Sequence, residues 1–319
     1  MPIQTQMEEK MFRSQMKAES IDDASQFRYP CYVSEKLDGW RCLIVDGIAY
    51  TSGGKEFKPP VQERFRRIIQ AAHKARLVLD GELYYNHNSN FGELSSTLSA
   101  SLEVMAERNL RFYAFDAITY DEWYGRSRQE QFSDRLILYS DFCKAHDHTD
   151  LILPVEQHWC NHEADADAYY AKVKAQGGEG VMMRTPTGTY TPNTRSKNIV
   201  KRKIWNDCSA KIVAIHQLAS PLKYADEVRE IDGVKHGFKR RAGSVTVEIL
   251  PDQPLPAGVQ QNATFTPAAF HLRDQFWTER ETLIGKIVDF EYLAGATKGR
   301  MGRIFRLRED IVSGNTLGL

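Results

Sequence analysis

The pattern of apolar residues changes at about residue 207, and no other feature of the sequence constrains the fold as strongly. Before this point, strand-like runs alternate with segments of helical spacing, such as the helix expected from Pro59 to about residue 75. After it, the apolar runs are short, strand-like and separated by turns rich in proline and glycine. The pattern predicts two domains: residues 1–206, of mixed helices and strands, and residues 207–319, a small closed barrel of strands.

Within residues 1–206 the sequence predicts a polar helix at the start, followed by strands that alternate with helices. Asp46-Gly47 indicates a hairpin turn, and Gly177-Gly178 is a helix-stop signal. The expected helices are residues 4–19, 59–75, 128–146 and 164–176, and the expected strands are residues 31–36, 41–52, 76–84, 110–118, 180–184 and 198–205.

The composition excludes several classes of protein. Of 319 residues, 42% are hydrophobic and 26% charged, as in soluble globular proteins. No run of about 18 apolar residues is present, and the first residues carry charges where a signal peptide needs an apolar stretch. Five cysteines form no CxxC pair, which favours a reducing compartment. We therefore expect a cytoplasmic monomer that is not secreted and does not contact a membrane.

Charge is unevenly distributed along the chain although the net charge is zero. Residues 1–194 hold 22 Lys and Arg against 28 Asp and Glu, whereas residues 195–319 hold 20 against 14. A basic second half suggests a second domain that touches a polyanion. The alternative is an ordinary solvated surface.

The segment from Glu35 to Arg41 gathers an acid, a lysine and a second cation at the end of an expected strand. A lysine is a poor nucleophile while protonated, because its ordinary pKa is about 10.4. Neighbouring cations and partial burial lower the pKa of a lysine and free its amine, and a nucleophilic Lys36 would require both. A hairpin with a surface pair between Lys36 and Asp38 is the alternative interpretation.

Four later segments favour the chemical interpretation. Three of them place acids at or near strand ends: Asp80-Gly81-Glu82-Leu83, Phe115-Asp116 and the segment from Glu179 to Arg184. The fourth contains Lys201 and Lys203, which lie on one face of a strand because side chains alternate along it. One nucleophilic amine, several carboxylates for Mg²⁺, two further amines for a phosphate and an aromatic ring for a base suit nucleotidyl transfer.

In their order, these segments resemble motifs I, III, IIIa, IV and V of the covalent nucleotidyltransferases, and Arg306-Leu307-Arg308-Glu309-Asp310 resembles motif VI. The resemblance covers about residues 30–310 and is greatest to ATP-dependent DNA ligases, in particular the minimal two-domain type of bacteriophages and other viruses. It implies an α+β fold: an antiparallel-sheet nucleotidyltransferase (adenylation) domain over residues 1–206, followed by an all-β OB-fold domain over residues 207–319. If a virus encodes the chain, the host cytoplasm is its expected location.

The resemblance also implies a reaction and its site residues. An ATP-dependent DNA ligase attaches AMP to a lysine, transfers it to the 5′-phosphate of a nick in duplex DNA and seals the nick. The implied cofactors are ATP and Mg²⁺, or Mn²⁺ in its place. The implied catalytic residues are Lys36, Asp38, Lys201 and Lys203. The implied nucleotide-binding residues are Glu35 and Lys36, Arg41 and Glu82 at the ribose, Phe115 and Met182 at the base, Lys201 and Lys203 at the α-phosphate, and Arg306 and Arg308 at the leaving pyrophosphate. The implied metal-binding residues are Glu179, Asp38 and Glu82.

The implied DNA contacts include one departure from the family. Motif Ia usually has an arginine that faces the nick, and this chain has Ser52 there, so Lys55 is the expected substitute. Two basic clusters, expected in glycine-containing turns of the barrel, would hold the DNA backbone. They comprise Lys235, Lys239, Arg240 and Arg241, and Lys298, Arg300 and Arg303. The alternative for each is a solvated hairpin tip.

Three other functions compete with a DNA ligase. An mRNA-capping enzyme would begin motif IV with Asp, where this chain has Glu179, and RNA ligases usually lack the arginine found at Arg41. An OB-fold nucleic-acid-binding protein without catalysis, the third function, would not need Lys36.

A zinc site is a separate possibility that the cysteines and histidines raise. The candidate ligands match no common zinc spacing; they are Cys143, His146, His148, His158, Cys160 and His162.

Overall fold

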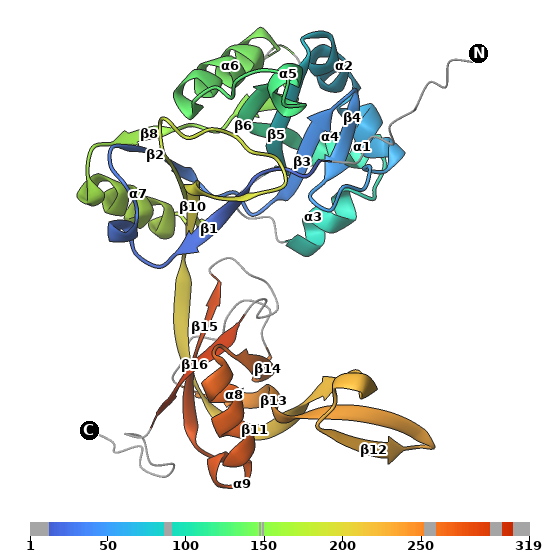
Figure 1. The fold of residues 1–319 in the computed structure, drawn as a ribbon, viewed down its shortest axis with the longest axis vertical. Coiled ribbons are helices and arrows are strands. Elements are labelled where there is room, and N and C mark those ends of the chain that lie inside the picture. The colour runs from blue at the N-terminus through green and yellow to red at the C-terminus, as the bar shows by residue number, and fades with distance from the viewer. Residues whose placement is uncertain are drawn as a thin grey trace, which may run out of the picture. The chain divides into compact units, whose positions relative to one another are not determined.

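The computed structural model describes residues 13–85, 91–146, 148, 150–251, 260–293 and 302–308 (Figure 1). The chain divides into two compact units between Lys203 and Ile204, three residues before the boundary expected from the sequence. None of the helices in the described ranges is long and apolar enough to cross a membrane. Each unit is built around its own sheets.

The first sheet of the first unit contains the strand that ends just before Lys36 and the strands of motifs IV and V. Its order is β1-β10-β9-β2-β8, and all pairs are antiparallel except β1 with β10, which is parallel. Helix α7 packs on this sheet. The bounds are β1 Lys17–Ile21, β10 Arg195–Lys203, β9 Gly180–Arg184, β2 Cys31–Glu35, β8 His158–Cys160 and α7 Glu163–Ala175.

The N-terminal helix expected over residues 4–19 is wrong for its last part, because Lys17–Ile21 is a strand. Met16 and Ala18 are buried while Lys17 between them is exposed, which is the alternation of a strand with one covered face. Residues 4–12 lie outside the described residues. The strand depends on pairing with β10, far away in the sequence, so local spacing did not reveal it.

The second sheet has the order β4-β3-β5-β6-β7, with β5 buried along nearly its whole length. The β3–β4 hairpin turns at Asp46 and Gly47, whose φ angles are 51° and 80°, as predicted. Apolar residues of α2 and α6 pack on this sheet to form the main core. The bounds are β3 Trp40–Val45, β4 Ile48–Thr51, β5 Leu77–Tyr84, β6 Arg111–Thr119, β7 Ile152–Pro154, η1 Ala24–Gln26, α1 Pro59–Arg64, α2 Arg66–Lys74, α3 Phe91–Thr97, α4 Leu102–Glu107, α5 Tyr120–Trp123 and α6 Phe132–Ala145.

The second unit is a six-stranded sheet with the order β11-β15-β16-β14-β13-β12, and pairing of β11 with β13 closes it into a barrel. Its core is apolar and includes Val245, Phe265 and Phe290. The bounds are β11 Trp205–Ser220, β12 Glu227–Ile231, β13 Val234–Ile249, β14 Asn262–Pro267, β15 Ile287–Leu293, β16 Arg303–Arg308, η3 Leu222–Tyr224, α8 Phe270–Thr278 and α9 Arg280–Leu283.

Two short α-helices accompany the barrel, although the sequence pattern indicated strands alone. In α8, Leu272 and Phe276 are four residues apart and both are buried in the barrel core. That pair is a helical signal, but it is too short to stand out among the surrounding strand-like runs.

The charge asymmetry of the chain has a different origin from the one expected. Residues 204–319 hold 15 Lys and Arg against 14 Asp and Glu, so the second unit is nearly neutral. The positive excess comes from residues 195–203, which hold five Lys and Arg and no acid, and these residues form β10 of the first unit. The basic segment therefore belongs to the first unit and not to the barrel.

Candidate active site

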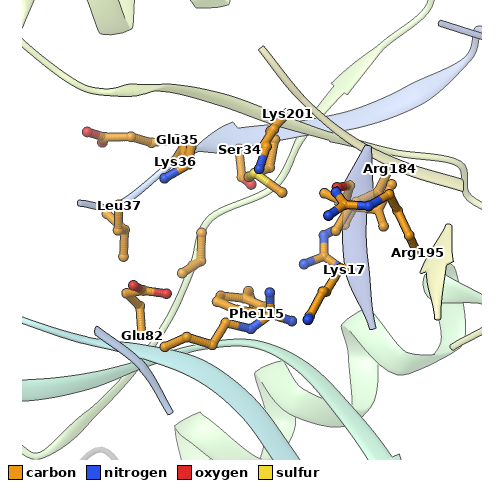
Figure 2. A pocket seen from close by; sticks show the side chains of 15 residues that line it. Lys17, Ser34, Glu35, Lys36, Leu37, Glu82, Phe115, Arg184, Arg195 and Lys201 are labelled. Atoms are coloured by element: carbon orange, nitrogen blue, oxygen red, sulfur yellow. The ribbon is translucent and has the colours of Figure 1, made fainter. Parts of the chain in front are cut away.

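A cavity of about 260 Å³ is lined by residues of both sheets of the first unit (Figure 2). Its lining combines cations, two glutamates and one aromatic ring. Seven of the predicted site residues line it, namely Glu35, Lys36, Arg41, Glu82, Phe115, Met182 and Lys201. The other lining residues, which had no predicted role, include Lys17, Ser34, Leu37, Arg184 and Arg195.

Lys36 directly follows β2 and is held at the cavity by backbone and side chain. Its N–H donates a hydrogen bond to the carbonyl oxygen of Gly180 over 2.9 Å. Its ammonium group pairs with one carboxylate oxygen of Glu179, and the other oxygen lies 3.2 Å from Nζ of Lys203. Glu179 is buried, so a single carboxylate lies between two lysines in a site of limited solvent access.

Two glycines of the motifs are required by close packing. A Cβ at Gly39 would lie 2.5 Å from Cγ of Glu82 and from the carbonyl oxygen of Leu83. Gly180 has a φ of 149°, and a Cβ there would lie 2.2 Å from the carbonyl oxygen of Arg202. These glycines let β3 approach β5 and let β9 approach β10, which brings the glutamates and lysines of the site together.

Arg41 is fixed by Asp80, an acid to which the sequence analysis gave no individual role. The guanidinium donates from Nε to Oδ1 of Asp80 over 2.8 Å and from Nη2 to Oδ2 over 2.6 Å. Asp80 also accepts from the hydroxyl of Tyr190 over 2.6 Å, and that hydroxyl accepts from the backbone N–H of Met16 over 3.0 Å. Burial acts to lower the pKa of Arg41, but the Asp80 carboxylate outweighs it and the pKa is raised. The only sequence signal for this role was an acid inside an apolar strand.

Phe115 lies beneath two guanidinium groups. The Cζ atoms of Arg41 and Arg184 are 5.0 and 5.3 Å from its ring centroid. Asp116, fully buried, accepts from Arg135 over 2.7 Å and from Arg184 over 3.0 Å. Burial lowers the pKa of Arg184, although the Asp116 carboxylate acts to raise it, and the charges of Arg41 and Arg135 lower it further.

Two titratable groups of the cavity have altered acidity. Burial raises the pKa of Glu82 to about 8, although Lys36 and Arg41 act to lower it. Burial lowers the pKa of Lys201, and the charges of Lys203 and Lys36 lower it further. Both shifts report a site shielded from water in which lysines lie close together.

The three acids predicted to bind metal are not gathered into one cluster. No group of three or more His, Cys, Asp or Glu side chains suited to a metal ion occurs among the described residues. Glu179 pairs with two lysines, Glu82 is favoured in its neutral form by burial, and Asp38 does not line the cavity. This donor set suits Mg²⁺ bound chiefly through nucleotide phosphates, with one or two carboxylates, rather than a metal enclosed by protein ligands. The zinc alternative finds no support there either, and all five cysteines are free and buried.

Lys17 and Arg195 reach the cavity because β1 pairs with β10 in parallel, which places the two residues opposite each other. Figure 2 shows both on the side of the cavity that is remote from Lys36. Arg195 is anchored by a hydrogen bond to the carbonyl oxygen of Ala18. The basic run of residues 195–203 could have indicated Arg195, whereas Lys17 had no signal in the sequence.

The predicted DNA contacts of the first unit lie in an exposed turn. Ser52 and Lys55 follow β4, and the backbone N–H of Thr51 donates to the carbonyl oxygen of Lys55 over 2.8 Å. Neither residue lines the cavity.

The first basic cluster of the second unit is part of a strand, so its expected position in a turn is wrong. It lies within β13, beside a register shift against β11. Lys239 pairs with Asp226 over 3.0 Å, Arg240 with Glu227 over 3.4 Å and Arg241 with Asp274 over 3.2 Å. Lys298 and Arg300 of the second cluster lie outside the described residues.

Arg306 and Arg308 share one buried partner in the second unit. Nε of Arg306 donates to Oδ2 of Asp289 over 2.9 Å, and Nη1 of Arg308 lies 3.5 Å from Oδ1. The hydroxyl of Ser209 donates to the same Oδ1 over 2.7 Å. Asp289 therefore holds both arginines on one face of the barrel.

Residues 15–203 match the family model described as the ATP dependent DNA ligase domain. The chain belongs to the ATP-dependent DNA ligase family. As a member of it, the ligase joins DNA strands by forming phosphodiester bonds and uses ATP. No curated protein matches the sequence of this ligase.

Solved structures of DNA ligases share the fold. A structure described as belonging to the Lig E DNA ligases is 22% identical, has a TM-score of 0.62, and the match covers 93% of this chain and 100% of that one. The Chlorella virus DNA ligase-adenylate is 21% identical with a TM-score of 0.50, covering 95% and 100%. The ATP-dependent DNA ligase from bacteriophage T7 in complex with ATP is 15% identical with a TM-score of 0.50, covering 92% and 98%. The predicted class, a nucleotidyltransferase domain followed by an OB-fold domain, is confirmed.

Proposed function

We propose that this ligase seals nicks in duplex DNA as a monomer, with Lys36 as the residue that carries AMP. The observation that supports this most directly is the position of Lys36, whose amine faces a cation-lined cavity beside a buried carboxylate. Free buried cysteines are consistent with the cytoplasm as the proposed compartment.

In the first step the amine of Lys36 attacks the α-phosphorus of ATP. The amine must first lose a proton, and the carboxylate oxygen of Glu179 that it contacts is placed to accept it. A bond forms between Nζ and phosphorus, the bond to the bridging oxygen breaks, and pyrophosphate leaves. Lys201 and Lys203 neutralise charge on the phosphoryl group, which is the main requirement of phosphoryl transfer.

The nucleoside occupies the remainder of the cavity. Arg41 and Glu82 face each other across paired strands and would bind the ribose, with Glu82 able to donate a hydrogen bond when it is protonated. Phe115 and Met182, which belong to different sheets, would contact the base from two sides. Glu35 lines the same cavity and would contribute a backbone or side-chain contact.

Mg²⁺, or Mn²⁺ in its place, supplies charge neutralisation at the reacting phosphates when it is bound. Glu179 is the carboxylate beside the reacting amine and would contribute a ligand. Glu82 would contribute after losing its proton. Asp38 follows Leu37, which lines the cavity, and is the third proposed carboxylate.

Transfer of AMP to the nick requires a site for the 5′-phosphate. This phosphate must reach the phosphorus carried by Lys36, whereas Lys17 and Arg195 line the side of the cavity remote from Lys36. Ser52 and Lys55, in the exposed turn after β4, are therefore the proposed contacts. The basic residues of β13 would add contacts to the DNA backbone once phosphates replace their carboxylate partners.

Incubation with labelled ATP and Mg²⁺, followed by mass spectrometry, tests the assignment of Lys36. We expect covalent AMP on the peptide that contains Lys36, and no AMP on Lys36→Arg. The exposed Lys74→Arg on α2 is a matched control that should be adenylated normally. AMP on Lys36→Arg at the wild-type level would refute the assignment, and labelling by GTP instead of ATP would indicate a capping-type enzyme.

A sealing assay tests the substrate. Nicked duplexes with DNA or RNA on each side of the nick are compared, and sealing only of RNA-containing nicks would contradict the proposal. Sedimentation at working concentration tests whether the ligase is a monomer.

A further inference from the structure

Phe270 is an exposed aromatic side chain that the barrel does not need for packing. It is the first residue of α8 and is 70% exposed, the largest value among the exposed large hydrophobic side chains of the described residues. Of the other apolar residues on this helix, Leu272 and Phe276 are buried in the barrel core, and Trp277 packs against that core partly buried. A single exposed phenylalanine is ordinary, so its surroundings decide whether it has a role.

Two guanidinium groups from different elements lie over the Phe270 ring. The Cζ of Arg241, from β13, is 5.4 Å from the ring centroid, and that of Arg273, from α8, is 5.7 Å away. Each arginine is held in place: Arg241 pairs with Asp274 over 3.2 Å, and Nε of Arg273 donates to the carbonyl oxygen of Pro267 over 3.2 Å. The cluster Phe270–Arg241–Arg273 is therefore a prearranged aromatic group with two cations and one carboxylate.

The chemistry of this cluster matches the surface of duplex DNA. Its aromatic ring is suited to deoxyribose and base edges, and guanidiniums at its sides are suited to the flanking phosphates. A protein partner would need a larger apolar area than one ring, and the two arginines leave the cluster positive in a unit that is otherwise almost neutral. The charge and the shape both favour a polyanion with apolar edges.

We propose that Phe270 contacts the sugar and base edges of the nicked duplex while Arg241 and Arg273 contact the phosphates on either side. This inference rests on the proposed sealing of nicked DNA. The contact made by the Phe270 ring should contribute to DNA affinity independently of salt. The phosphate contacts of the two arginines should contribute less as the salt concentration rises.

Binding of a fluorescent nicked duplex, measured by anisotropy in EDTA over a range of salt concentrations, tests the proposal. We expect Phe270→Ala to weaken binding about tenfold, as removal of an aromatic contact to nucleic acid does. The slope of log affinity against log salt should not change, because no charge is removed. Phe270→Trp should retain binding. Arg273→Ala should flatten the slope by about 0.9, the value for one phosphate contact.

Ile284→Ala is the matched control, because Ile284 is an exposed apolar residue of the same unit, 48% exposed. Melting temperatures establish that each variant is folded. If Phe270→Ala binds DNA as tightly as Ile284→Ala, the inference is refuted. It is equally refuted if Phe270→Ala changes only the sedimentation of the protein, which would make the ring a contact between copies of the chain. Failure of the wild-type protein to bind nicked DNA would instead refute the proposed function.

Discussion

The ammonium group of Lys36 is paired with the carboxylate of Glu179, which precedes the first residue of β9. The amine that is expected to attack ATP is thus held beside an acid that can take its proton. The same acid contacts Lys203 through its other oxygen. The proposed proton transfer from Lys36 requires the negative charge of the Glu179 carboxylate rather than its shape.

Glu179→Gln removes that charge with little change of shape. We expect the rate of AMP attachment to fall roughly 100-fold, the usual contribution of a positioned proton acceptor. Single-turnover labelling with ATP measures the rate. Glu163→Gln, at an exposed position on α7, is the control. A variant Glu179→Gln that reacts at the wild-type rate would show that the carboxylate only supports the fold.

Asp80→Asn should destabilise the first unit and also weaken ATP binding. Removing one partner of a buried ion pair leaves Arg41 without a counter-ion, which should lower the free energy of unfolding by about 3 kcal/mol. Urea unfolding measures the loss, and the ATP dependence of adenylation should show a raised KM. Asp121 pairs with Arg76 at the surface, so Asp121→Asn should change the free energy of unfolding by about 0–1 kcal/mol. Equal effects of the two substitutions would contradict the role of Asp80.

Gly180→Ala should separate β9 from β10. A Cβ there would overlap the backbone of Arg202, and a backbone atom cannot move aside as a flexible side chain can. We expect a lower melting temperature and loss of adenylation, because Met182 and Lys201 lie on these strands. At Gly53 an added carbon would lie 4.0 Å from Oγ1 of Thr51, an ordinary contact, so Gly53→Ala should melt like the wild type. A stable and active Gly180→Ala would mean that β9 and β10 can move apart without harm.

Arg308→Ala should impair attachment of AMP far more than later steps. Pyrophosphate leaves only in the first step, and its negative charge is what the two arginines at Asp289 would stabilise. The same variant should seal a nick that already carries AMP at close to the normal rate. Lys211→Ala, in β11 and paired with Glu248 at the barrel surface, is the control for effects on the barrel. Equal losses of Arg308→Ala in both assays would assign the arginine to folding or to DNA contact.

The sequence predicted the site residues that belong to short local motifs. Lys36, Arg41, Glu82, Phe115, Met182 and Lys201 all line the cavity, because each occurs in a motif whose strand is also encoded locally. Lys17 was missed because its position depends on the pairing of β1 with β10. Asp80 and Asp116 occur in motifs, but each carboxylate accepts hydrogen bonds from arginine, Asp80 from Arg41 and Asp116 from Arg135. The sequence does not show which side chain each acid pairs with.

The fold was predictable to a similar extent. The hairpin at Asp46 and the helix stop at Gly177 follow from local backbone preferences, and both are present. The basic cluster at Lys239 was expected in a turn because its segment contains glycine, yet it lies in a long strand. That strand is stabilised by pairing with β11 on one side and β12 on the other, and such pairing outweighs the local preference of a single glycine.

The parallel pairing of β1 with β10 also sets the order in which the site can be assembled during synthesis. The backbone N–H of Met16 is bonded to Tyr190, 174 positions later in the chain, and Lys17 lies opposite Arg195. Contacts so distant in sequence form slowly, and on the ribosome they cannot form until the later partner has emerged. The first strand to be made must therefore wait for the last strand of its sheet. A nascent chain that ends before β10 would lack Lys201 and Lys203 and would leave β1 without its partner.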